Sequence, residues 1–288
     1  NKMHDFSSER KLKLGYISSD FRYHAVANFI KPILEAHNRK NFTLVGYYNN
    51  WIPDTQTVLL KDLFDQWREI KHLTVAEVCN QIVDDNIDVL IDLNGHTTGN
   101  SLAVFKKKPA PLQISWLGYP NATGLNEIDF IVGDNIVAPS NLDQNFDERS
   151  APLRLKDGHH CYHQIFESQL TDLPANKNGF VTFGSFNTLA KLSRKTIKLW
   201  ASVLKSIPDA RLIIKRSPLK IEAARNRILS QFKTEGVPNK RILFSWDIKS
   251  TADHLKEYSN IDIALDTFPY NGITTTCDAL WMGVPVVT

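Results

Sequence analysis

The sequence is poor in cysteine, has no long apolar segment and carries little net charge. Its three cysteines, Cys79, Cys161 and Cys277, lie far apart, which argues against a disulfide framework and against a cysteine zinc site. No apolar run is long enough to cross a membrane, and the first residues lack a signal-peptide pattern. The net charge is +3, and the longest basic run, at residues 106–108, is too short to mark a nucleic-acid surface. We therefore expect a cytoplasmic globular protein without a membrane or nucleic-acid partner.

Several motifs that identify common enzyme classes are also missing. No Gly-x-Gly-x-x-Gly follows a strand pattern, and neither a Walker A lysine loop nor a Gly-x-Ser-x-Gly elbow occurs. Dehydrogenases, phosphate-loop enzymes and serine hydrolases therefore lose their main support. The Asp-x-Asp signature of metal-binding single-domain sugar transferases is absent as well. His159, His160 and His163 lie close in sequence but have no second ligand cluster, so we expect no metal site.

Apolar strand patterns alternate with helix patterns along the chain, which is typical of parallel sheets covered on both faces. One series of strands begins at residues 11–18 and a second at 180–183, and between about residues 149 and 178 Pro, Gly, Asn and His interrupt the pattern. We therefore predict an α/β protein with a lobe at 1–150, a linker at 151–178 and a lobe at 179–288. Two such Rossmann-like, doubly wound lobes would face a cleft and bind ligands at the carboxyl ends of their strands.

The end of the chain carries the clearest candidate for an anion site. Residues 261–265 form a strand pattern, Pro269 and Gly272 interrupt it, and a helix pattern begins at residues 274–276, which are all threonine. Unpaired N–H groups and the positive end of the helix dipole favour an anion there, and the hydroxyls add donors. Asp278, one turn further on, could accept hydrogen bonds from a ribose. The alternative is that the threonines only cap the helix.

Loops after predicted strands hold the other candidates. His24 and His96 could act as general bases, because imidazole titrates near neutral pH. Lys191, in the loop after the strand at 180–183, could meet the charge of a phosphate. His254 could stack on a flat heterocycle. Each residue has a structural alternative. His24 and His96 could be structural imidazoles, Lys191 a solvated surface lysine and His254 a helix cap.

Four segments resemble the catalytic region of the O-linked N-acetylglucosamine transferase family, glycosyltransferase family 41, which includes the SPINDLY branch. They read LGYISSDF at 14–21, PAPLQISWLGYP at 109–120, NGFVTFGSFNTLAK at 178–191 and LDTFPY at 265–270. The residues of the last two segments are more similar to those of the SPINDLY branch and of bacterial relatives than to those of the animal enzymes. Together the segments span nearly the whole chain.

The resemblance implies a GT-B fold, inversion at the sugar carbon and no obligatory metal or other cofactor. It implies transfer from a nucleotide sugar to Ser or Thr hydroxyls of an acceptor protein or peptide. It also implies tetratricopeptide repeats before Asn1 and further helices after Thr288. The chain begins without Met and stops inside an apolar strand pattern, so we expect a fragment whose second lobe is incomplete.

The same resemblance assigns roles to individual residues. Lys191 matches the lysine that neutralises the leaving diphosphate, and Thr274 and Thr275 match phosphate-binding hydroxyls. Asp278 matches the ribose acceptor and His254 the histidine that packs on the base, while two first-lobe residues contact the sugar through their backbone. The full set assigned to nucleotide-sugar binding is Leu117, Gly118, Asn187, Lys191, His254, Asn271, Gly272, Thr274, Thr275 and Asp278.

The catalytic base and the donor leave alternatives open. His24 matches a histidine proposed as the base, a role that the phosphate of the donor could take instead. Ile273 stands where the animal enzymes have a histidine beside the diphosphate. We predict UDP-N-acetylglucosamine as the donor, with GDP-fucose transfer of the SPINDLY type as the alternative. A nucleotide-sugar-binding scaffold without turnover is the alternative from another class, and the presence of Lys191, His24 and the threonines argues against it.

Overall fold

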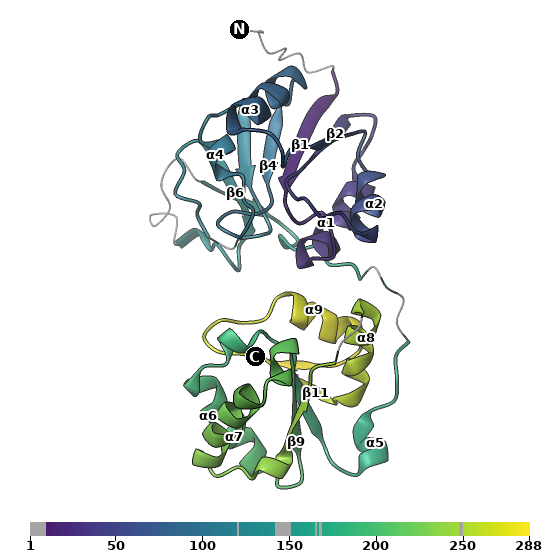
Figure 1. The fold of residues 1–288 in the computed structure, drawn as a ribbon, viewed down its shortest axis with the longest axis vertical. Helices are drawn as coiled ribbons and strands as arrows, with labels where there is room; N and C mark the ends of the chain where they lie inside the picture. The colour runs from purple at the N-terminus through teal and green to yellow at the C-terminus, as the bar shows by residue number, and fades with distance from the viewer. Residues whose placement is uncertain (1–9, 120, 142–150, 165, 167–168, 248–249) are drawn as a thin grey trace. The chain divides into compact units, whose positions relative to one another are not determined.

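The computed structural model describes residues 10–119, 121–141, 151–164, 166, 169–247 and 250–288. The chain divides into two compact units, Asn1–His163 and Gln164–Thr288 (Figure 1). Each unit contains its own parallel sheet. Strand β7 (Ala151–Leu155) and helix α5 (Pro174–Asn178) lie inside the stretch that the sequence assigns to a linker, and β7 pairs with β6 of the first sheet.

The first unit is a seven-stranded sheet with the order β3-β2-β1-β4-β5-β6-β7, in which every described pairing is parallel. The strand pattern at residues 11–18 is confirmed as β1. The elements are β1 (Leu12–Ser18), α1 (Ala25–Ala36), β2 (Phe42–Tyr48), α2 (Thr55–Lys61), β3 (Gln66–Glu69), α3 (Val75–Asp84), β4 (Val89–Asp92), α4 (Leu102–Phe105), β5 (Leu112–Ser115), β6 (Phe130–Asp134) and β7.

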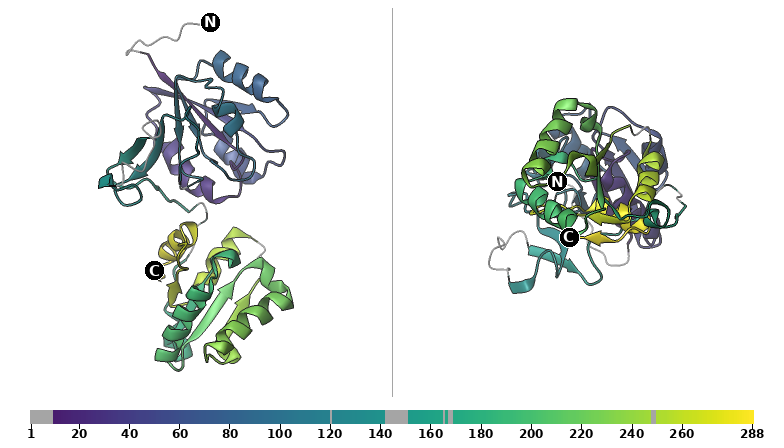
Figure 2. Two further views of the ribbon diagram at one scale, coloured as in Figure 1. Left: turned by 90° about the vertical axis from the view of Figure 1, so that its left-hand side faces the viewer. Right: turned by 90° about the horizontal axis from the view of Figure 1, so that it is seen from below.

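The second unit is a five-stranded parallel sheet with the order β10-β9-β8-β11-β12. Figure 2 shows helices on both faces of it, as right-handed crossovers in two directions require. Its elements are α5, β8 (Thr182–Ser185), η2 (Leu189–Lys191), α6 (Arg194–Ser206), β9 (Arg211–Lys215), η3 (Ser217–Lys220), α7 (Glu222–Thr234), η4 (Asn239–Arg241), β10 (Ile242–Ser245), α8 (Thr251–Lys256), η5 (Glu257–Asn260), β11 (Ile263–Leu265), α9 (Thr274–Trp281) and β12 (Val286–Val287).

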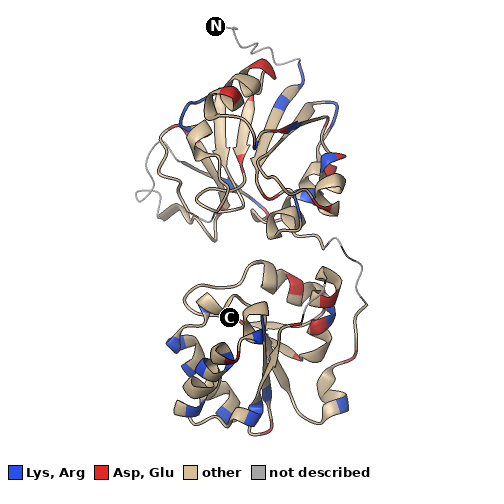
Figure 3. Cartoon of the chain, viewed as in Figure 1, with Lys and Arg blue, Asp and Glu red and all other residues tan. Residues whose placement is uncertain are grey.

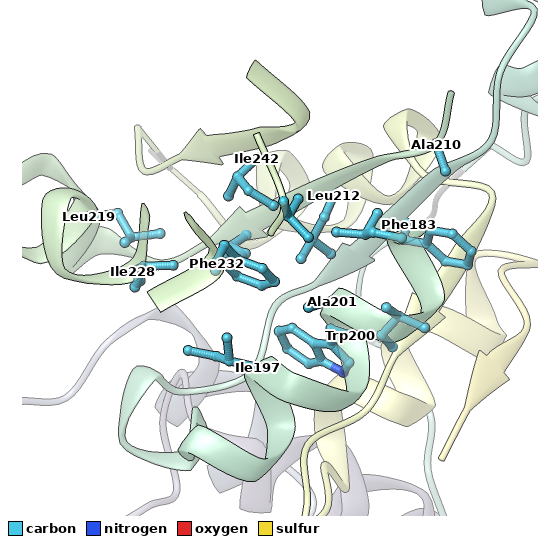
Figure 4. Packing of buried hydrophobic residues seen from close by; sticks show 14 residues of the cluster. Phe183, Ile197, Trp200, Ala201, Ala210, Leu212, Leu219, Ile228, Phe232 and Ile242 are labelled. Carbon is cyan, nitrogen blue, oxygen red and sulfur yellow. The ribbon is translucent and has the colours of Figure 1, made fainter. Parts of the chain in front are cut away.

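Each unit has a core made from its own residues. In the second unit, helix α6 buries Ile197, Trp200, Ala201 and Leu204, which recur at helical spacing, against the sheet and Phe232 of α7 (Figure 4). Several basic residues of this unit lie on α6 and α7 (Figure 3). The first unit has its own buried cluster, which includes residues of β1, β2, α3 and β4.

Each sheet reverses its strand order at one place. In the first sheet the reversal falls between β1 and β4, and in the second between β8 and β11. The loops that follow such strands diverge, and ligands of doubly wound proteins bind in the space they leave. The polar segments picked out from the sequence follow these strands. Among the described residues, no helix has the length and apolarity that crossing a membrane would require.

Candidate functional site

Asp266, which directly follows β11, connects the loops at the reversal of the second sheet. Its Oδ1 accepts hydrogen bonds from the Gly272 N–H (2.7 Å) and from Asn187 Nδ2 (3.1 Å). Its Oδ2 accepts from Asn271 Nδ2 (3.1 Å) and from Thr288 Oγ1 (3.2 Å). The loop before α9 is therefore bound to the end of β8. The sequence analysis assigns no role to Asp266, although an acidic residue at the end of an apolar strand is a signal it could have used.

Position 272, in the loop before α9, has no room for a side chain, because the loop passes close to Thr275 and Asn187 there. A Cβ there would lie 2.5 Å from Thr275 Oγ1 and 2.8 Å from Asn187 Oδ1. Any larger residue would push α9 and the β8 loop apart. The predicted positions Asn187, Asn271, Gly272 and Thr275 thus lie together in the structure.

Lys191 reaches the same loop from η2. Its Nζ donates to the carbonyl of Asn271 (2.6 Å) and lies 4.3 Å from the centre of the Tyr270 ring. Burial lowers the pKa of Lys191, Asp266 opposes that shift, and Arg216 adds to it. The ammonium therefore lies at the loop that precedes α9, and a second cation is close to it.

The first turn of α9 is not capped by its threonines. The residue at the N-cap position is Ile273, and the helix start has no side-chain cap. Thr275 Oγ1 instead donates to Asn187 Oδ1 (2.9 Å), and Thr276 Oγ1 donates to the carbonyl of Gly272 (3.1 Å). The hydroxyl of Thr274 has no hydrogen-bond partner in the part of the chain that the structure describes. The capping alternative is therefore wrong, because the N-cap position is occupied by a residue without a polar side chain.

Asp278 lies one turn further along α9 and is 4% exposed. Gln164 Nε2 donates to its Oδ1 (3.2 Å), and His254 Nε2 lies 3.3 Å from its Oδ2. The main-chain carbonyl of His254 accepts from Lys215 Nζ (2.7 Å). The two predicted nucleoside contacts, Asp278 and His254, are therefore side by side, and a buried lysine holds the backbone of one of them.

Lys215 is the least expected member of this group. It ends β9, is 1% exposed, and its ammonium lies 4.3 Å from the centre of the Phe186 ring. Burial lowers its pKa to about 7, and Glu257 and Asp278 oppose the shift. The sequence alone gives Lys215 no role beyond its place at the end of a strand.

Arg216, the next residue, is a second cation that the sequence analysis leaves out. Its Nε is buried, and the guanidinium has no hydrogen-bond or ion-pair partner among the residues that the structure describes. Burial lowers its pKa, and the charges of Tyr258 and Asp278 oppose the shift. Two adjacent basic residues at the end of an apolar strand are the signal that could have identified this position.

At the reversal of the first sheet, the structure contains a polar cavity of about 380 Å³. Asn94, after β4, joins its two sides, because its Nδ2 donates to Asp20 Oδ2 (2.7 Å) and Ser19 Oγ (3.0 Å) after β1. The loops at the ends of the two central strands are therefore fixed to each other. The lining residues are Ser19, Asp20, Arg22, His24, Asn49, Asn50, Lys71, Thr97, Thr98 and Gly99.

His24 lines this cavity and also begins helix α1. The Val26 N–H donates to His24 Nδ1 (3.3 Å), and Asp20 Oδ2 lies 3.7 Å from the same nitrogen. Burial lowers the pKa of His24, the charge of Asp20 opposes the shift, and Arg22 adds to it. A neutral ring that accepts at Nδ1 carries its proton on Nε2. In this geometry Nε2 of His24 is therefore a donor.

Two other histidines of the first unit, His96 and His159, have structural partners. His96 Nε2 lies 2.7 Å from the carbonyl of Thr123, and its ring packs edge-on against Tyr119. His159 Nδ1 lies 2.7 Å from Asp134 Oδ2, and this hydrogen bond lowers the pKa of the Asp134 carboxyl. Among the described residues, no three His, Cys, Asp or Glu side chains are grouped so that they could hold a metal ion.

Leu117 and Gly118, the predicted sugar contacts, form a tight and strained turn after β5. Leu117 has φ +76°, and the Gly118 N–H donates to the carbonyl of Trp116 (3.0 Å). A Cβ on Gly118 would lie 1.9 Å from the carbonyl oxygen of Leu93. Such strain in a non-glycine residue persists only where the surrounding structure enforces it, and it is concentrated at functional sites.

The two Rossmann-like units and the polar loops at their strand reversals define a glycosyltransferase of the GT-B class. A solved structure shares this fold at very low identity: the lipopolysaccharide outer core galactosyltransferase WaaB, with a TM-score of 0.60 and 12% identity over 96% of this chain and 80% of the other. An O-GlcNAc transferase mutant (K341M) from Thermobaculum terrenum is more similar, with a TM-score of 0.89 and 37% identity over 97% of this chain and 53% of the other.

The sequence profile of glycosyl transferase family 41 matches residues 1–164 and 164–288, and the chain belongs to that family. A relative from Solanum lycopersicum, named probable UDP-N-acetylglucosamine–peptide N-acetylglucosaminyltransferase SPINDLY, is 40% identical over 97% of this chain. A protein of the same activity name, SEC, from Arabidopsis thaliana is 29% identical over 97% of this chain. The chain spans 30% of the tomato relative and 29% of SEC.

Proposed function

We propose that the protein containing this chain is an inverting protein O-glycosyltransferase that moves N-acetylglucosamine from UDP-N-acetylglucosamine to Ser or Thr hydroxyls. The observation that carries the proposal is the start of α9 beside Lys191 and Arg216, which has no side-chain cap and whose Thr274 hydroxyl has no partner among the described residues. The relatives named above support the choice of donor. An acceptor protein or peptide, and tetratricopeptide repeats elsewhere in the protein, belong to the same proposal, and no metal has a part in it.

The leaving diphosphate would bind at the start of α9. The N–H groups of the first turn, the hydroxyl of Thr274 and the Lys191 ammonium all offer donors to its oxygens. Negative charge develops there as the bond to the sugar breaks, and fixed donors stabilise that charge most effectively. Arg216, whose guanidinium is unpaired in the described part of the chain, would add a further cation.

The nucleoside would occupy the neighbouring group of His254 and Asp278. Asp278 accepts from Gln164 and lies beside His254, and its carboxylate would also accept from the ribose. Because Lys215 holds the main chain of His254, the imidazole has a fixed position for packing on the base. This arrangement supports a nucleoside site.

In the first unit, His24 would orient the acceptor hydroxyl. Its Nε2 carries the proton while Nδ1 caps α1, so the ring can donate to an oxygen but has no free lone pair for the acceptor proton. The phosphate of the donor is then the group that takes the proton. Leu117 and Gly118 would present strained backbone to the sugar, as the resemblance implies.

Replacing Lys191 by alanine tests the leaving-group role. We expect kcat to fall by about 100-fold, because a fixed charge at a developing anion typically contributes that much. Lys195→Ala is the matched control, because Lys195 is an exposed lysine of α6 near in sequence. Equal transfer rates in the wild type and Lys191→Ala would show that Lys191 has no part in the reaction.

The identity of the donor can be tested separately. We expect UDP to raise the melting temperature in a thermal-shift titration, since a ligand that binds only the folded state stabilises it. GDP should produce a smaller shift at the same concentration. Stabilisation by GDP alone would replace the N-acetylglucosamine proposal with fucose transfer. Donor hydrolysis without any acceptor would exclude a scaffold that only binds.

A further inference from the structure

The cavity of the first unit carries more positive than negative charge. Arg22 and Lys71 line it together with one carboxylate, that of Asp20. His24 lines it as well, and burial keeps its imidazole neutral at neutral pH by lowering the pKa. The cavity therefore has one more positive group than negative, and an anion would balance it.

The two cations have donors that the fold does not use. Lys71, in the loop after β3, has no hydrogen-bond or ion-pair partner among the residues that the structure describes. The Nε of Arg22 is buried without a hydrogen bond, and its ion pair with Asp20 Oδ1 is long, at 3.9 Å. Asp20 has its short contact with Asn94 Nδ2 instead, at 2.7 Å. Because buried N–H groups almost always have an acceptor, this arrangement points to a ligand with oxygens.

The neutral side chains of the lining are already occupied in holding its walls. Asn49 Nδ2 donates to the carbonyl of Gly99 (3.0 Å), and Asn50 Nδ2 donates to the carbonyl of Ser19 (2.9 Å). Besides the His24 ring and the hydroxyl of Thr98, the groups left among the lining residues to meet a ligand are therefore the charged ones. The cavity, at about 380 Å³, is large enough for a side chain with some adjoining backbone.

We propose that this cavity binds the carboxylate of an Asp or Glu in the acceptor polypeptide, close in sequence to the Ser or Thr that receives the sugar. The inference rests on the proposed function, which brings the acceptor hydroxyl to His24 on the same cavity wall. A carboxylate accepts charge-assisted hydrogen bonds from both an ammonium and a guanidinium. A neutral hydroxyl would leave the excess positive charge unbalanced.

Peptide affinity measured by fluorescence anisotropy on the intact protein tests this site. The probes are short labelled peptides with one central serine and one glutamate stepped along the positions on either side, and a matching set with glutamine. We expect about tenfold tighter binding of the glutamate peptide in at least one position, the effect of a charge-assisted hydrogen bond. Lys71→Gln should abolish that preference, and Lys71→Glu should transfer it to a peptide with lysine at the same position.

Lys61→Gln is the matched control, because Lys61 is an exposed lysine of the same unit that does not line the cavity. It should keep the preference of the wild type for glutamate. The proposal is overturned if the wild type binds both peptide sets equally, if Lys71→Gln keeps the preference, or if Lys61→Gln loses it as well. Sugar transfer is measured in parallel. A preference for glutamate without sugar transfer would support the carboxylate site and contradict the proposed function. Sugar transfer without that preference would support the proposed function and contradict the carboxylate site.

Discussion

At the scale of a single residue, Lys215 shows how burial changes the pKa of a charged side chain. Its ammonium lies over the Phe186 ring and donates to the His254 carbonyl, and the residue is 1% exposed. Its pKa falls from 10.5 to about 7 because burial penalises the charged form. Near neutral pH the residue that fixes His254 is therefore divided between charged and neutral states.

We expect Lys215 to make the stability of the second unit depend on pH. Between pH 7 and 10.5 the unfolded chain binds a proton that the folded chain lacks, so the free energy of unfolding should rise with pH across that window. Below pH 7 both states are protonated and the effect ends. Lys215→Met should remove the rise, and the exposed Lys220→Met should keep it. Urea unfolding at several pH values checks this, and equal slopes in the wild type and Lys215→Met would contradict it.

At the scale of an element, the start of α9 has two threonines with different tasks. Thr275 donates to Asn187, which in turn donates to Asp266, so its hydroxyl belongs to the network that holds the loop. The hydroxyl of Thr274 is unused by the described residues. One threonine therefore stabilises the element, and the other is available to a ligand.

Replacing each threonine by valine separates these tasks. Thr275→Val leaves the Asn187 carbonyl without its donor, and we expect a loss of about 1 kcal/mol in unfolding free energy. Thr274→Val should melt close to the wild-type temperature but bind UDP more weakly, because it loses a phosphate donor. Differential scanning calorimetry and UDP titration measure the two effects. Equal effects of both variants on melting would show that the assignment of tasks is wrong.

At the scale of the whole molecule, the two units have separate cores. Phe232 is fully buried in the cluster that also contains Phe183, Trp200 and Leu212, all in the second unit. We expect Phe232→Ala to destabilise that unit by about 3–5 kcal/mol. Amide hydrogen exchange should therefore accelerate in β8 and β9 and stay unchanged in β1 and β4. Equal acceleration in both units would mean that they unfold together.

The site illustrates what could be predicted. Lys191, His254, Asp278 and the threonines were identified because they stand at strand ends or helix starts, or match family segments. Asp266, Lys215 and Arg216 were missed, since a charge at the end of a strand does not reveal its partners. The Asp266 carboxylate binds donors that are up to 79 residues away in sequence.

The sequence by itself determined the alternation of strands and helices, and with it the α/β class, because each local apolar period requires a sheet or helix that buries one face. It also determined the family, through long segments that span the chain. Only the tertiary structure decided, for the residues that it describes, which threonine hydroxyl is unused and which cations are left without a partner. Those properties depend on hydrogen bonds between distant residues, and no local pattern encodes them. The threonines at the start of α9 are accordingly not caps: Thr275 and Thr276 donate within the fold, and the hydroxyl of Thr274 is unused by the described residues.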